Sequence, residues 1–171
     1  MRLKFEKIFI FGAILVLSNV VEASDPKMIG EYGDWTAYVF MENKNKVCYM
    51  LSQPKKEEGN YKQRGDIFAL ITHRPAEGSK HVFSYNAGYP YKPDSEVTVR
   101  IDGQNFTLFT QGESAWASDE ATDSKLALAI QRGSSLTVKG LSMRGTATTD
   151  TFGLKGSSAA YKAISAECGI K

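Results

Sequence analysis

The sequence has few of the residues from which catalytic and metal sites are built. Its 171 residues include only two histidines, His73 and His81, and two cysteines. The histidines flank a turn at Gly78 and could approach each other across a hairpin, but no third or fourth ligand stands at a spacing that would complete a zinc site. We therefore interpret both as half-exposed strand residues.

Signatures of nucleophilic and phosphate-handling enzymes are also missing. The string nearest to a Gly-x-Ser-x-Gly nucleophile elbow, residues 112–116, lacks the second glycine, and no glycine-rich phosphate loop occurs. The sequence therefore predicts no catalytic residue, no metal ligand and no cofactor, and favours a non-enzymatic protein. A hydrolase with an unrecognised site is the alternative.

The chain has no large excess of either charge. It carries 21 basic and 19 acidic residues, and residues 1–23 hold three of the former and two of the latter, leaving 18 and 17. Because nucleic-acid binding usually needs a concentrated basic face, this balance argues against a nucleic-acid partner.

Long apolar runs are confined to the N-terminus, where residues 1–23 are predicted to be a signal peptide. A basic start precedes the apolar run Ile8–Leu17, and small residues precede a predicted cleavage after Ala23. An uncleaved anchor is the alternative, but a membrane span needs about 20 apolar residues, and this run is shorter. No later stretch is long and apolar enough to span, so we expect no transmembrane segment after cleavage.

The two cysteines, Cys48 and Cys168, are predicted to form a disulfide. Oxidising compartments form and keep such bonds, and two cysteines in an exported chain usually pair. Two free buried thiols are the alternative. The pair would join an early segment to the last residues of the chain.

Residues 24–171 are predicted to form a single exported β-rich domain, since their number suits one core. Residues 55–64 are polar and are interpreted as a solvent loop. Period-two patterns predict strands over residues 34–40, 46–53, 80–85, 96–101, 104–110, 135–143 and 147–154, and a continuous apolar run predicts another over residues 66–74. The expected fold is mainly β, either an antiparallel β-sandwich or a strongly curved sheet, with two short helices.

The clearest local signal is a hairpin around Asp102-Gly103. This dipeptide is typical of a type I′ turn. The register it sets places Val99 opposite Phe106 and Val97 opposite Leu108, which builds one apolar surface.

Two helices interrupt the strand pattern. Asp123 is predicted to cap a helix over Ser124–Arg132, and Ser157 to cap a second helix that runs to Glu167. In the second helix, Tyr161 and Ile164 share with Cys168 the spacing of one buried stripe. We therefore expect the disulfide to tie the C-terminal helix to an early strand.

One loop is a candidate for partner binding. It holds Tyr85, Tyr89, Pro90 and Tyr91. Amphipathic rings on a proline-stiffened loop lose little entropy on binding and are common in recognition surfaces. The alternative is that the rings pack down as a lid over the open end of the sheet. We interpret the two tryptophans, Trp35 and Trp116, as core aromatics.

Short motifs in a fixed order carry a family resemblance. They are Gly33-Asp34-Trp35, Val47-Cys48-Tyr49, Arg74-Pro75, Gly88-Tyr89-Pro90, Ala115-Trp116, Arg144-Gly145-Thr146, Asp150-Thr151-Phe152, and Gly156 ahead of a terminal helix with Cys168. In these the chain resembles the invasion-associated locus B proteins of alphaproteobacteria.

The resemblance implies a periplasmic or cell-surface protein, linked in pathogenic members with invasion of or adherence to host cells. It implies no enzyme activity and no cofactor, and an unknown envelope or host-cell protein as partner. Because members also occur in free-living bacteria, the resemblance also implies a general role in envelope maintenance that could underlie the invasion phenotype. A periplasmic inhibitor or scavenger of host defence proteins is the alternative binding function.

Overall fold

The computed structural model describes residues 24–171, so the predicted signal peptide lies outside the described residues. Eleven strands form one antiparallel sheet in the order β1-β2-β3-β5-β6-β9-β8-β7-β10-β11-β4. The elements are β1 (Lys27–Tyr32), β2 (Trp35–Glu42), β3 (Asn45–Ser52), β4 (Lys56–Gly59), β5 (Phe68–Arg74), β6 (Ser79–Asn86), β7 (Glu96–Ile101), β8 (Gln104–Gln111), β9 (Ser114–Trp116), α1 (Glu120–Arg132), β10 (Ser135–Leu141), β11 (Ala147–Gly153) and α2 (Ser157–Cys168).

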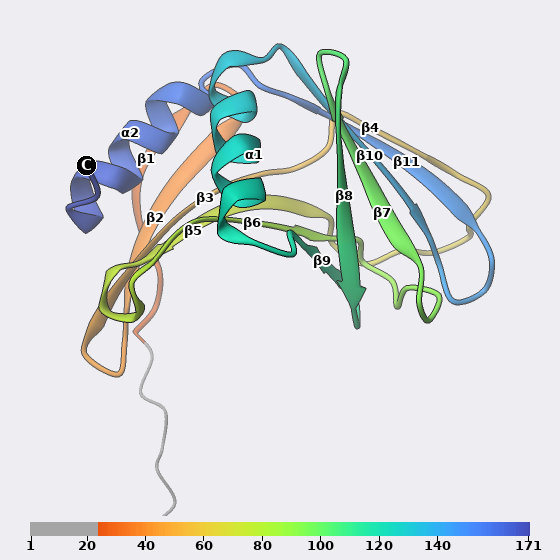
Figure 1. The fold of residues 1–171 in the computed structure, drawn as a ribbon, viewed down its shortest axis with the longest axis horizontal. Helices are drawn as coiled ribbons and strands as arrows, with labels where there is room; N and C mark the ends of the chain where they lie inside the picture. The colour runs from red at the N-terminus through yellow and green to blue at the C-terminus, as the bar shows by residue number, and fades with distance from the viewer. Residues whose placement is uncertain (1–23) are drawn as a thin grey trace, which may run out of the picture.

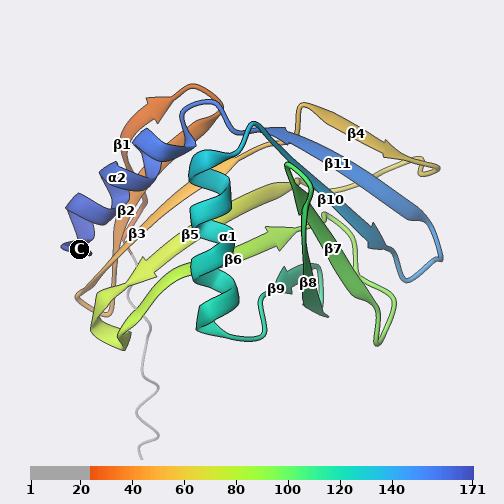
Figure 2. The same cartoon turned by 45° about the horizontal axis from the view of Figure 1, so that its top comes forward.

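The sheet bends strongly, and both helices lie against its inner face (Figures 1 and 2). Helix α2 packs on β1, β2 and β3, and α1 packs on β6. Of the two predicted architectures, the strongly curved sheet is confirmed. The sheet is continuous because β9 and β8 lie between β6 and β7. Strand β9 pairs with β6 on one side, and β7 pairs with β10 on the other.

Three strands were not predicted: β1, β4 and β9. The interpretation of residues 55–64 as a solvent loop was wrong for Lys56–Gly59, which pairs with β11 at the far edge of the sheet. The chain leaves β3, crosses to that edge, and returns to β5 beside β3 (Figure 2). All three strands are short or lie at a sheet edge, where pairing supplies the stability and the apolar pattern is weak.

The core lies between the inner face of the sheet and the two helices. Trp35, Met50 and Phe152 contribute from the strands, and Leu126 and Ile164 from the helices, each with at most 1% of its surface exposed. Each such side chain contributes about 1.5 to 3 kcal/mol through burial of apolar surface. The core therefore holds both helices on the same side of the sheet.

The predicted hairpin is confirmed as β7 and β8. Val99 pairs with Phe106 and Val97 with Leu108. Asp102 and Gly103 both have positive φ, at 44° and 91°, as a type I′ turn requires.

Helix α1 begins earlier than predicted, and Asp123 is not its cap. Asp119 is the N-cap, and its carboxylate accepts a hydrogen bond from the Thr122 N–H. Asp123 lies in the first turn, where it accepts a hydrogen bond of 2.8 Å from the Phe83 N–H. Strand β9 pairs only with the last three residues of β6, so it does not reach Phe83. The Asp123 carboxylate of α1 accepts the hydrogen bond of the Phe83 N–H instead.

Helix α2 ends within one residue of its predicted end, but Ser157 is not its cap. Gly156 is the N-cap with a φ of 88°, and a Cβ there would lie 1.9 Å from the Tyr32 carbonyl oxygen. The Ser157 hydroxyl instead donates to the Ile130 carbonyl and so joins α2 to α1. Ile164 and Cys168 are buried as the predicted stripe requires.

Candidate functional site

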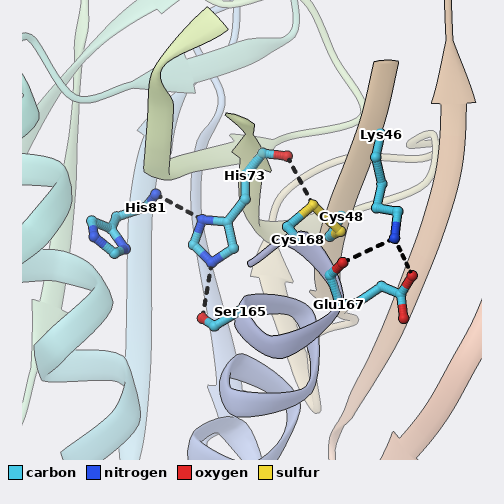
Figure 3. The surroundings of a disulfide bond; sticks show 7 residues. All are labelled: Lys46, Cys48, His73, His81, Ser165, Glu167 and Cys168. Carbon is cyan, nitrogen blue, oxygen red and sulfur yellow. Dashed lines mark hydrogen bonds and ion pairs between the residues drawn. A yellow bond between two sulfur atoms is a disulfide. The ribbon is translucent and has the colours of Figure 1, made fainter. Parts of the chain in front are cut away.

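The predicted disulfide between Cys48 and Cys168 is confirmed. It ties β3 to the last residue of α2, with the two Cα atoms 6.0 Å apart. An ion pair of 2.8 Å between Lys46 and Glu167 joins the same two elements at the surface (Figure 3). Such a bond is typical of an oxidising, extracytoplasmic compartment.

His73 lies beside the disulfide and is fully buried, contrary to the prediction of a half-exposed residue. Its Nδ1 accepts a hydrogen bond of 3.1 Å from the backbone N–H of His81, and its Nε2 lies 3.2 Å from the Ser165 Oγ (Figure 3). His81 stands where the β5–β6 register shifts, with a φ of 64°. His73 therefore satisfies a donor that the bulge leaves unpaired, which is a structural role.

The two histidines do not form the core of a metal site. Tyr161 hydrogen-bonds Nδ1 of His81, while both ring nitrogens of His73 are engaged. Within residues 24–171 no group of three or more His, Cys, Asp or Glu side chains gathers as metal ligands would.

The burial of His73 predicts a pH-dependent contribution to stability. Burial, and secondly repulsion from His81, lower the pKa of His73 from its ordinary value to about 4. The neutral ring therefore stabilises the fold fully above pH 6.5, and this contribution, about 3 kcal/mol, is lost as pH falls towards 4. The unfolding free energy of wild type should fall more between pH 7 and pH 4.5 than that of His73→Asn.

The comparison with the variant is needed because a second buried group changes the free energy of unfolding with pH in the opposite direction. Burial raises the pKa of Asp123 to about 6, so its contribution to stability falls as pH rises through the range from about 4 to 6. Wild type and His73→Asn share this effect of Asp123, so it cancels when their unfolding free energies are subtracted. Equal pH dependence of urea unfolding in the two proteins would contradict the prediction.

The tyrosines of the predicted binding loop lie in different environments. Tyr85 and Tyr91 are buried, with 1% and 6% of their surface exposed. Tyr89 is half-buried and Pro90 is exposed. Only Tyr89 and Pro90 can contact a partner without rearrangement of the fold, and the role of the loop in binding stays a prediction.

A buried ion pair, which sequence reasoning missed, holds this loop in place. Arg64 donates to both carboxylate oxygens of Asp150 at 2.7 and 2.6 Å, and the two side chains are 3% and 0% exposed. Arg64 also donates to the Ala87 carbonyl at 2.6 Å. A bidentate pair of this kind is strong and directional. Through Arg64, this pair fixes two segments to strand β11: the residues between β4 and β5, and the loop after β6.

Tyrosine side chains complete the surroundings of the pair. The Tyr85 hydroxyl donates to Asp150 and accepts from Arg64. Burial, and secondly the Asp150 carboxylate, raise the pKa of Tyr85, so its hydroxyl keeps the proton that it donates. The guanidinium carbon of Arg64 lies 4.9 Å from the centre of the Tyr89 ring, within the range of a cation–π contact.

Above this network lies a cleft of about 670 Å³ between segments 60–65, 88–90 and 142–148. Two of its lining residues are joined directly, because the Gly65 N–H donates to the Gly88 carbonyl at 2.8 Å. Gly88 has a φ of 67°, and a Cβ there would lie 2.4 Å from the Gly65 oxygen. Glycine at this position therefore allows the two segments to approach closely.

The rim of the cleft combines apolar and cationic side chains. Tyr89, Pro90 and Met143 provide the apolar part, and Met143 is 61% exposed. Lys62 and Arg144 are exposed, and neither takes part in an ion pair among residues 24–171. No carboxylate lines the cleft. Such a surface can bind an extended segment that carries negative charge.

Among residues 24–171 no helix has the length and apolar character needed to cross a bilayer. The fold and the cleft together define a small β protein that is cross-linked by one disulfide and has a cationic cleft beside a tyrosine–proline loop. A family model described as "Invasion associated locus B (IalB) protein" matches residues 35–165. The chain belongs to this family, so the resemblance seen in the sequence is confirmed. Searches of the curated proteins and of the solved structures found no match.

Proposed function

We propose that this protein is an exported, non-enzymatic envelope protein that acts through protein–protein contact, either in host-cell invasion and adherence or in envelope maintenance. Membership of the invasion-associated locus B family supports the proposal. The disulfide supports export to the periplasm or the cell surface.

The observation that carries the proposal is the position of Tyr89 and Pro90 at the rim of the cleft. Exposed tyrosine, arginine and methionine side chains around a concave surface are typical of protein interfaces. Here Tyr89, Met143 and Arg144 lie on that rim. Arg64 of the buried pair contacts the Tyr89 ring, and the Met143 N–H donates to the Pro90 carbonyl at 2.8 Å. The contact surface is therefore pre-formed, which lowers the entropic cost of binding.

Replacing Met143 and Arg144 with alanine is expected to weaken partner binding at least tenfold, because hot-spot truncations cost about 2 kcal/mol or more. Partners would be captured by cross-linking in intact cells and identified by mass spectrometry, and affinity then measured with the purified partner. Tyr89→Ala with Pro90→Ala tests the other side of the rim, and thermal melting checks that its fold is intact.

The matched control is Lys92→Ala with Pro93→Ala. These exposed residues belong to the same loop but do not line the cleft. Their replacement should leave binding unchanged. If the folded variants on both sides of the rim bind the partner with wild-type affinity, the cleft is not the binding site.

A further inference from the structure

The sheet has an outer face, opposite the helices, whose first half is apolar. Cross-strand register places Leu51, Leu70, Ser84, Trp116 and Phe109 side by side on β3, β5, β6, β9 and β8. Trp116, interpreted from sequence as a core aromatic, is absent from the core cluster and is only partly buried on this face. Phe109 at the end of the row is 47% exposed.

A second row runs parallel to the first. Tyr38 on β2 pairs with Tyr49 on β3, which pairs with Thr72 on β5. The Tyr38 and Tyr49 rings stack with centroids 5.2 Å apart, and Phe40 meets Tyr49 edge-on at 6.0 Å. Phe40, Tyr49 and Thr72 border a shallow groove of about 400 Å³, and Leu51, Phe68 and Leu70 also line it. The two rows make one contiguous, mainly apolar surface that extends from β2 to β8, with Thr72 of β5 and Ser84 of β6 among its polar members.

The other half of the same outer face is polar. On β7, Thr98 and Arg100 point outward, and register places Thr107 of β8 and Lys139 of β10 beside Thr98. All four are exposed. An antiparallel sheet with one face in water shows this alternation of apolar and polar residues. The apolar half departs from the rule, so solvent is not its expected environment.

The sequences of β2, β3 and β5 show the same departure. Residues 35–41, 47–51 and 68–71 are almost continuously apolar, a pattern found in strands that are buried on both faces. Helix α2 packs on these three strands. On the opposite face Pro26 lines the groove, and Met28, which pairs with Tyr38, is 47% exposed.

The charges around this surface favour a second copy of the chain as its occupant. Arg74, at one end of the groove, is paired with Glu42 and Glu77. Exposed glutamates lie at the two ends of the first row, where register places Glu96 beside Phe109 and Glu31 beside Thr36, the partner of Leu51. The residues at the centre of the patch are uncharged, so two copies can meet there without like-charge repulsion. Outside residues 1–23 the basic and acidic residues number 18 and 17, and a net charge near zero promotes association.

We propose that the apolar outer face, defined by Tyr38, Phe40, Tyr49, Leu51, Leu70, Trp116 and Phe109, is the interface of a two-fold symmetric dimer. A two-fold contact uses the same patch on both chains, so an apolar surface is complementary to itself. Two sheets would pack face to face about 10 Å apart, as in a β-sandwich. The dimer would leave both clefts free, since they are lined by residues that follow β4 and join β10 to β11, and these three strands lie at the end of the sheet away from β2 and β3.

Analytical ultracentrifugation of the exported chain, with its disulfide intact, tests the proposal. Wild type should sediment at twice the monomer mass at concentrations of about 100 μM. Leu70→Lys and Phe109→Lys should each weaken association at least tenfold, because the two-fold axis brings the new charge into the interface twice. Phe109 is exposed at the patch border, so its replacement keeps the fold even where Leu70→Lys does not.

The matched control is Thr98→Lys. It adds the same charge on the same outer face, but within the polar half. The control should dimerise as wild type does. A wild type that is monomeric at about 100 μM, a dimer that survives both patch substitutions, or equal dissociation of the control would each overturn the proposal. The result is independent of the partner-binding experiment, which concerns the cleft.

Discussion

Replacement of both Cys48 and Cys168 with alanine should lower the free energy of unfolding by about 4 to 5 kcal/mol, the chain-entropy value for a loop of this length. The bond joins residues 120 positions apart, so its loss frees most of the unfolded chain. The melting temperature is expected to fall by about 10 to 15 °C. Thermal melting monitored by circular dichroism measures the change.

The control for this prediction is Lys46→Ala. It removes the ion pair with Glu167 that joins the same strand and helix, but both side chains are well exposed, at 44% and 37%. An exposed pair contributes less than about 1 kcal/mol. Equal melting temperatures of wild type under oxidising and reducing conditions would show that the bond does not stabilise the fold.

Asp150→Ala is expected to lower the free energy of unfolding by about 3 to 5 kcal/mol, because it leaves the guanidinium of Arg64 buried without a counter-charge. The Arg64 side chain is only 3% exposed and is held between the Tyr89 ring and the Ala87 carbonyl. Combining Asp150→Ala with Arg64→Met should cost less than the sum of the two single changes. Urea unfolding of the four proteins gives the coupling energy.

Glu58→Ala is the control for the buried pair. Glu58 lies on the neighbouring strand β4 and pairs with Lys56 at 2.8 Å, with side chains 49% and 66% exposed. Its removal should change the unfolding free energy by less than about 1 kcal/mol. A cost of similar size for Asp150→Ala would mean that the buried pair does not hold the loops of the cleft.

Part of this site could have been recognised from the sequence. Strand period places Asp150 on the same side as Phe152, and an acidic residue on a core-facing position usually has a partner. The partner could not be named, because Arg64 lies 86 residues away in a polar segment. Likewise, four residues of the tyrosine–proline loop were predicted as candidates, but only the packing around Arg64 decides which tyrosines are buried.

The sequence by itself determined the local features: the hairpin around Asp102-Gly103, the existence of both helices, and the disulfide. The hairpin and the helices depend on turn residues and on the period of apolar side chains, which act over a short range of sequence. The disulfide was predictable because two cysteines can form only one pair. Helix caps were mispredicted because Asp123 and Ser157 bond to other elements. Only the tertiary structure decided the strand order, the partner of Asp150 and the exposed apolar face, since each depends on which distant strands pair.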